Sequence, residues 1–395
     1  MKKLFIIGII LVLGTSFLGC GSNDHNTNAG KISVSESDMD ENQPYFRDSM
    51  HCVAKAENGY YFMDIKEAHV CYYDNQQKES IILCNKAACS HSDDECMAYV
   101  DGNQYLTNLY YYRGNIYLLH QDSQGNIILQ SMEKDGSIRR DVAVLGTWGD
   151  DSTIQLVFSN GNAYVNINVS SISEEKVTIS LIEASLETGK TRKVYEYTDV
   201  NTSIKKMRAY GKQVYFILRK YEKVDGKSTL KGKGIYMYDT ESEKSQMILD
   251  VDAYDYCIDY SNNKLYYYVT SDGLYDYDFK TADSNKLIES SEDAAYCEVS
   301  FDGVHLFMDN SEWCGYSYHF LHVEKKYEKK LWMIGLDGKV LQTVPLKNIV
   351  TLYYGDSSRL FAYYAVEGER SKLCYMDKAG ILNGNTDWQS IEVSQ

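Results

Sequence analysis

Aromatic and apolar residues alternate with polar residues in short runs along most of this chain. Residues 263–286 show the pattern most clearly, because Leu265 and Tyr267 precede a polar turn at 271–273 and Tyr277 follows it. Alternation with a period of two, bounded by turn residues, predicts a β-hairpin that is half-buried on each face. The same hairpin pattern predicts the strands in the rest of the chain.

The same unit recurs along the chain, at intervals of roughly 40 to 55 residues. A second strand in each unit opens with Gly or Asn and an aromatic residue, as in Gly114-Asn115-Ile116-Tyr117, and third and fourth strands follow. The spacing predicts an all-β chain, a β-propeller of seven four-stranded blades, with six and eight blades as the alternatives. Inner strands are predicted to begin near Met50, Gln104, Thr153, Ser203, Ala253, Ala294 and Ile349.

Composition supports strands and excludes one class of partner. The chain has 36 Tyr and only 2 Pro, which favours strands over disorder. Its net charge is -16, whereas a nucleic-acid partner requires clustered Lys and Arg. We therefore expect no nucleic-acid binding.

The N-terminal residues have the order of a secretory signal. Lys2 and Lys3 precede an apolar run over 4–13, which is short for a transmembrane helix. Phe17-Leu18-Gly19-Cys20 resembles the lipobox of bacterial lipoproteins, in which the cysteine is lipidated; the alternative is an ordinary cleaved signal that ends in Cys. The lipobox implies a secreted protein, anchored through Cys20 to the outer face of the cytoplasmic membrane of a bacterium.

Three segments are therefore predicted. Residues 1–19 form the signal peptide, residues 20–47 form a polar, lipid-anchored flexible tether, and residues 48–395 form the propeller. Within the propeller, residues 84–103 form a cysteine-rich loop between the last strand of the first blade and the first strand of the second.

This loop contains the clearest chemical motif, Cys84-x4-Cys89-x-His91-x4-Cys96. Three thiols and one imidazole can supply four tetrahedral ligands to zinc, which would make the site structural. An extracellular location also permits disulfides, for which Cys52 and Cys71 are further candidates. Zinc or another soft metal, disulfides and free thiols all stay open, and in each of the first two states the four residues lie close together and fix the loop.

The lipobox, the strand pattern and the cysteine segment together resemble uncharacterised surface lipoproteins of Gram-positive anaerobes. In that group a similar segment stands in the same place before a propeller. The resemblance implies a β-propeller at the cell surface and no particular activity.

Two functions follow from the sequence as hypotheses. The first is a non-catalytic binding module, because a propeller presents a rigid rim to a peptide, glycan or protein ligand. The alternative is an extracellular hydrolase or lyase acting on polysaccharide or peptide, for which Asp276 and Asp278 are an example of two neighbouring carboxylates. No Gly-x-Ser-x-Gly or His-Glu-x-x-His motif supports catalysis, and we expect no catalytic residue.

Overall fold

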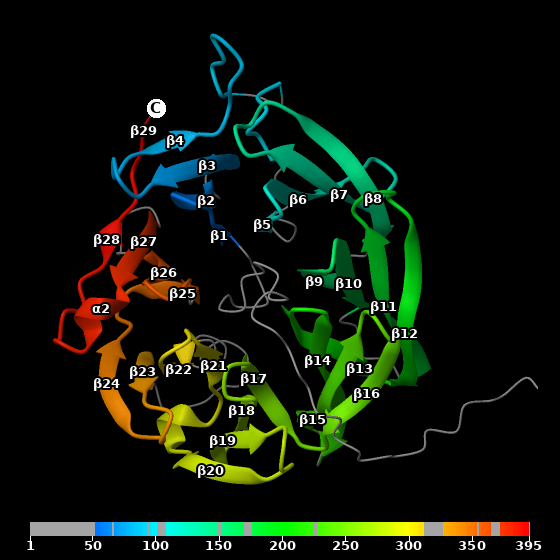
Figure 1. Cartoon of the computed structure of the whole chain (residues 1–395), viewed down its shortest axis with the longest axis vertical. Helices are drawn as coiled ribbons and strands as arrows, with labels where there is room; N and C mark the ends of the chain where they lie inside the picture. The colour runs from blue at the N-terminus through cyan, green and yellow to red at the C-terminus, as the bar shows by residue number, and fades with distance from the viewer. Residues whose placement is uncertain are drawn as a thin grey trace, which may run out of the picture.

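Seven antiparallel sheets of four strands stand in a ring, which makes the chain a seven-bladed β-propeller (Figure 1). The computed structural model describes residues 52–394 except 65–66, 93–94, 101–107, 149–151, 170–175, 225–226, 312–326, 354 and 365–371. The predicted fold class and blade number are confirmed. The predicted signal peptide, the tether and Cys20 lie outside the described residues.

The first four blades contain the strands of residues 53–249. Blade 1 has β1 (Val53–Lys55), β2 (Gly59–Asp64), β3 (His69–Asp74) and β4 (Ser80–Ile82). Blade 2 has β5 (Leu109–Tyr112), β6 (Asn115–Gln121), β7 (Asn126–Glu133) and β8 (Arg139–Thr147). Blade 3 has β9 (Ser152–Ser159), β10 (Asn162–Val169), β11 (Lys176–Ser185) and β12 (Thr191–Val200). Blade 4 has β13 (Thr202–Tyr210), β14 (Gln213–Val224), β15 (Lys227–Asp239) and β16 (Lys244–Leu249).

The last three blades complete the ring. Blade 5 has β17 (Ala253–Asp259), β18 (Lys264–Val269), β19 (Gly273–Asp278) and β20 (Ser284–Glu289). Blade 6 has β21 (Glu298–Phe301), β22 (Leu306–Asp309), β23 (Lys330–Ile334) and β24 (Val340–Pro345). Blade 7 has β25 (Ile349–Tyr353), β26 (Arg359–Tyr364), β27 (Lys372–Asp377) and β28 (Gln389–Ser390), and β29 (Val393–Ser394) follows. Within the described residues, the helical elements with both bounds given are η3 (Glu292–Ala294) and α2 (Lys378–Ile381). The part of the chain that the structure describes contains no helix long and apolar enough to cross a membrane.

The hairpin predicted from residues 263–286 is formed by β18 and β19. Leu265 of β18 faces Tyr277 of β19, Tyr267 faces Tyr275, and Gly273, expected in the turn, begins β19 opposite Val269. One inner strand begins later than predicted: the strand expected near Ala294 begins at Glu298, because η3 occupies residues 292–294. The starts expected near Met50 and Gln104 lie outside the described residues, and the described parts of these inner strands are β1 from Val53 and β5 from Leu109.

The core lies between the blades. Apolar side chains from both faces of each sheet pack against the neighbouring sheets. One cluster joins blades 7, 1 and 2, and five others join blades 2 and 3, 3 and 4, 4 and 5, 5 and 6, and 6 and 7. Aromatic residues of the second strands supply much of this packing: Tyr117 is 5% exposed, and Tyr164 and Tyr215 are fully buried. Sheets that are apolar on both faces can bury those faces only by stacking in a closed ring.

Contacts between blades 7 and 1 close the ring. The Tyr60 hydroxyl donates to Asp356 Oδ2 at 2.6 Å, and the Tyr363 hydroxyl donates to the backbone oxygen of Met63 at 2.7 Å. Strand β29 pairs in parallel with the outer strand β4, so the end of the described chain adds a fifth strand to blade 1 (Figure 1).

Candidate metal centre

The cysteine-rich loop leaves blade 1 after β4 and folds back onto the start of β3. Val70 N–H donates to Ala98 O at 2.8 Å, and Val100 N–H donates to Ala68 O at 2.7 Å. These bonds place the loop beside the connection between the second and third strands of blade 1. The cysteine-rich loop, called the rim loop below, therefore lies on the same rim of the propeller as the connection between β2 and β3.

Contacts from both sides hold the loop between blades 1 and 2. The guanidinium of Arg139, on β8 of blade 2, donates to Tyr99 O at 2.5 Å. Within the loop, Lys86 and Glu95 form an ion pair of 3.0 Å between its two ends. Backbone atoms of the rim loop thus attach it to blades 1 and 2, and the ion pair brings the segments around Lys86 and Glu95 together.

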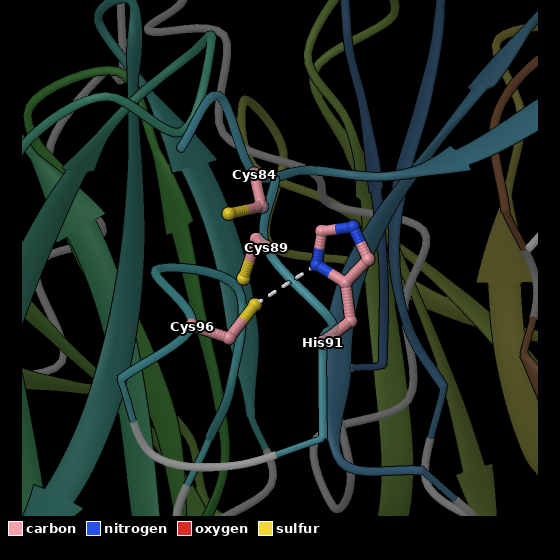
Figure 2. A group of neighbouring side chains, drawn as sticks. All are labelled: Cys84, Cys89, His91 and Cys96. Carbon is pink, nitrogen blue, oxygen red and sulfur yellow. Dashed lines mark hydrogen bonds between the residues drawn. The ribbon is translucent and has the colours of Figure 1, made fainter. Parts of the chain in front are cut away.

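The side chains of the motif converge in the middle of the loop. The sulfur atoms of Cys84, Cys89 and Cys96 and a ring nitrogen of His91 all lie within 4.8 Å of one another, and Figure 2 shows the three sulfurs gathered beside the imidazole. His91 Nδ1 is 3.3 Å from Cys96 Sγ. His91 has φ 54°, a left-handed conformation that turns the chain within this short segment.

Local hydrogen bonds make the thiols unequal acids. Desolvation by burial opposes ionisation of Cys84, but hydrogen bonds from the backbone of Lys86 and Met97 and from the neighbouring thiols lower its pKa. Burial, together with the neighbouring thiols of Cys84 and Cys89, raises the pKa of Cys96 to about 11. Three thiols this close cannot all ionise without a cation between them.

The donor set fits zinc. Four soft donors at about 2.0–2.3 Å from a tetrahedral zinc ion would lie roughly 3.5–3.8 Å from one another. The donor atoms of this cluster lie within 4.8 Å of one another, and one pair is 3.3 Å apart. The set of three thiolates and one imidazole also leaves no position open for water, which is the property of a structural site. The Cys₃His cluster can therefore bind a metal ion. A bound ion would link the four ligand residues of the rim loop.

None of the described cysteines forms a disulfide. Cys52 and Cys71, the further candidates for disulfides, are fully buried in the core of blade 1, and burial raises the pKa of Cys52 to about 12. Cys257, Cys297 and Cys374 are likewise buried. Each of these side chains behaves as a small apolar group in the core.

One neighbour of the cluster was not predicted from sequence. His69, at the start of β3, is buried, and its ring centroid lies 6.4 Å from that of His91. Burial lowers the pKa of His69, so the ring is uncharged at neutral pH beside the cluster. Because His69 belongs to an ordinary strand 22 positions before His91, no spacing in the sequence could point to it.

The neighbouring carboxylates of blade 5 have structural roles. Asp276 is 4% exposed, forms an ion pair with Lys264 and accepts hydrogen bonds from the backbone and side chain of Asn285. Asp278 accepts a bond from Lys280 N–H at 2.7 Å and shapes the turn after β19. Neither carboxylate is arranged as a catalytic acid or base.

Comparisons with known proteins support the fold and nothing narrower. No family model matches the chain, and no curated protein sequence matches it. Among solved structures, a prolyl endopeptidase is 12% identical with a TM-score of 0.56, over 88% of this chain and 50% of that one. This chain therefore spans half the length of that endopeptidase. The chain is also similar to TolB from Acinetobacter baumannii, at 15% identity and a TM-score of 0.38, over 83% of this chain and 76% of that one. An oligogalacturonate lyase in complex with manganese is 10% identical with a TM-score of 0.44, over 70% of this chain and 73% of that one.

Proposed function

We propose that this chain is a non-catalytic binding module, held at the outer face of a bacterial cytoplasmic membrane by a lipid on Cys20. In this proposal Cys84, Cys89, His91 and Cys96 hold a structural zinc ion that fixes the rim loop. The convergence of four soft ligand atoms within 4.8 Å supports it most directly, because such a closed set stabilises a fold and does not activate water.

A fixed loop gives the propeller a pre-organised rim. Without a cross-link, a polar loop of this length would lose conformational entropy each time a ligand bound and ordered it, which would weaken binding. Zinc would remove that cost before a peptide, glycan or protein ligand arrives. The metal would then act on binding through loop order, without touching the ligand.

Metal content is the first test. We expect purified full chain to contain about one zinc per molecule, and Cys89→Ser to contain less than a tenth of that amount, by inductively coupled plasma mass spectrometry. Zinc at 100 times its Kd stabilises the folded state by about 2.7 kcal/mol, so a chelator should lower the Tm of the natural protein but not that of Cys89→Ser.

Cys374→Ala is the matched control, because Cys374 is a buried free thiol in blade 7, far along the chain from the motif. It should keep the zinc. A protein without metal whose cluster cysteines are linked by disulfides would contradict the zinc assignment.

Binding and anchoring are tested separately. Arrays of peptides and glycans should yield ligands that bind and are recovered unchanged, whereas conversion of a bound ligand would show an enzyme. Mass spectrometry of the processed N-terminus should find diacylglycerol on Cys20, and a free N-terminus elsewhere would contradict the anchor.

A further inference from the structure

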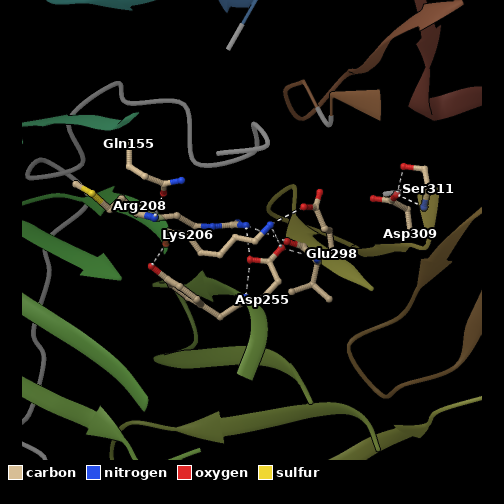
Figure 3. A network of polar contacts seen from close by, with 10 residues as sticks. Gln155, Lys206, Arg208, Asp255, Glu298, Asp309 and Ser311 are labelled. Atoms are coloured by element: carbon tan, nitrogen blue, oxygen red, sulfur yellow. Dashed lines mark hydrogen bonds and ion pairs between the residues drawn. The ribbon is translucent and has the colours of Figure 1, made fainter. Parts of the chain in front are cut away.

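Charged side chains where blades 4, 5 and 6 meet are paired with one another and almost closed to solvent. Lys206 Nζ contacts Glu298 Oε1, and Arg208 Nη2 donates to Asp255 Oδ1 at 2.8 Å (Figure 3). None of these four residues is more than 5% exposed. They join the blades and offer little surface to a molecule in solution.

The thiols of the Cys₃His cluster differ, because two of them are open to solvent in part. Cys84 and Cys89 are partly exposed, whereas Cys96 is only 3% exposed. All three sulfur atoms, which are grouped in Figure 2, lie within 4.8 Å of one another. The reactivity of a cysteine depends on access to its sulfur as well as on its ionisation. A reagent in solution therefore reaches Cys84 and Cys89 before Cys96.

The backbone between the two accessible cysteines is folded into a tight turn. Cys89 N–H donates to Lys86 O at 3.3 Å, and Ala88 has φ 56°. A disulfide brings two sulfur atoms to about 2.0 Å, so atoms that already lie within 4.8 Å need to approach by less than about 3 Å. A shift of that size is within reach of side-chain rotation in Cys84 and Cys89.

We infer that Cys84 and Cys89 form a redox-active pair, which a disulfide compound outside the cell oxidises to an intramolecular disulfide. The thiolate of one cysteine attacks the sulfur–sulfur bond of the compound, forms a mixed disulfide with one half and releases the other half as a thiolate. The thiolate of the second cysteine then attacks the mixed disulfide and releases the remaining half. Two thiolates of the chain are thereby oxidised, and one disulfide is reduced to two thiolates.

Oxidation of this pair would remove two of the four proposed zinc ligands, and to this extent the inference rests on the proposed function. The Cys96 thiolate and the His91 imidazole do not make a closed set of four ligands, so the zinc ion would leave. The turn at residues 84–89 would then lose its link to the rest of the rim loop.

The contacts that remain would fasten only the far end of the rim loop. Backbone hydrogen bonds and the guanidinium from blade 2 hold residues 98–100, which follow Cys96. The ion pair between Lys86 and Glu95 is exposed, and such pairs contribute little. Oxidation should therefore weaken ligand binding at the rim, because a ligand would again have to order the loop.

Oxidised glutathione is the probe for the natural protein, added in excess to the zinc-loaded, reduced full chain without oxygen. It should release about one zinc per molecule to a chromogenic chelator. Peptide mapping after alkylation should find a disulfide between Cys84 and Cys89, with Cys96 alkylated. Amide hydrogen exchange over residues 95–100 should become at least 10-fold faster, and a reducing agent with zinc should reverse each change.

Cys89→His and Cys96→His are matched variants. Each would keep four ligands, two thiolates and two imidazoles, which is also a structural zinc set. Cys96→His retains the pair and should release zinc when oxidised. Cys89→His retains Cys84 but not its partner, and should release zinc at least 10-fold more slowly. The two sites have the same ligand types and the same charge, so the difference in rate reports on the pair itself.

The outcomes separate the inference from the proposed function. A disulfide that includes Cys96 in the natural protein, equal rates of zinc release in the two variants, or zinc and amide exchange unchanged by excess oxidant would each overturn the inference. If a variant binds no zinc, the mapped disulfide of the natural protein decides. A purified chain without zinc would overturn the proposed function, and mapping of the oxidised chain would then decide separately whether Cys84 and Cys89 pair.

Discussion

Single hydroxyl groups decide how well neighbouring blades are joined. Tyr60 and Tyr238 are both almost fully buried second- and third-strand tyrosines, at 2% and 1% exposure. Tyr60 donates across the closing interface to Asp356, whereas the Tyr238 hydroxyl has no hydrogen-bond partner among the described residues. Identical side chains therefore have opposite energetic roles.

We expect Tyr60→Phe to lower the free energy of unfolding by about 1–3 kcal/mol, because the buried Asp356 loses a donor. Tyr238→Phe should be neutral or stabilising, because it removes a buried hydroxyl that pays desolvation without a bond. Denaturant unfolding of the two variants measures the contrast. Equal effects would show that the Tyr60 bond contributes nothing to closure.

At the scale of elements, glycines fix where a hairpin can turn. Gly273 begins β19 with φ 145°, and a Cβ there would lie 2.0 Å from Ile288 O of β20. Gly114 has φ 82° at the turn before β6, but a Cβ there would meet nothing within 4 Å. The first glycine is required by its backbone angle and by its neighbour, the second by its angle alone.

Gly273→Ala should therefore cost more than Gly114→Ala. We expect about 1 kcal/mol for Gly114→Ala from backbone strain, and about 2–4 kcal/mol for Gly273→Ala because the clash with β20 adds to the strain. Thermal and denaturant unfolding would give both values. A Gly273→Ala variant as stable as Gly114→Ala would mean that β20 moves away at little cost.

At the scale of the whole molecule, stability depends on closing the ring. Strand β29 joins the end of the described chain to blade 1 by pairing with Ser80 and Ile81, and the Ser80 hydroxyl donates to Glu392 O. Val393 also packs against the core that blades 7, 1 and 2 share. These contacts connect parts of the chain that are more than 300 residues apart.

Deletion of residues 392–395 should lower the free energy of unfolding by about 1–3 kcal/mol, from two or three lost hydrogen bonds and the exposed Val393 side chain. Glu392→Ala is the control, because it removes only the exposed ion pair with Lys372 and keeps the strand. If the deletion cost no more than this substitution, β29 would not contribute to ring closure.

The sequence by itself determined the repeat, the fold class and the residues of the Cys₃His cluster. Period-two alternation in each hairpin, as at Leu265 and Tyr267, requires a sheet, and seven such units with apolar residues on both faces require stacking. The motif from Cys84 to Cys96 is local, so its ligands are near one another in any compact loop.

Only the tertiary structure decided how distant polar residues meet. Arg208, Asp255 and Glu298 lie on three blades and about 45 residues apart from one to the next, and each looks like an ordinary polar position in a strand. His69 likewise lies near the Cys₃His cluster only because the rim loop folds back onto β3. Ring closure fixes these juxtapositions, since it sets which strands face one another, and alternation within a strand does not encode that choice.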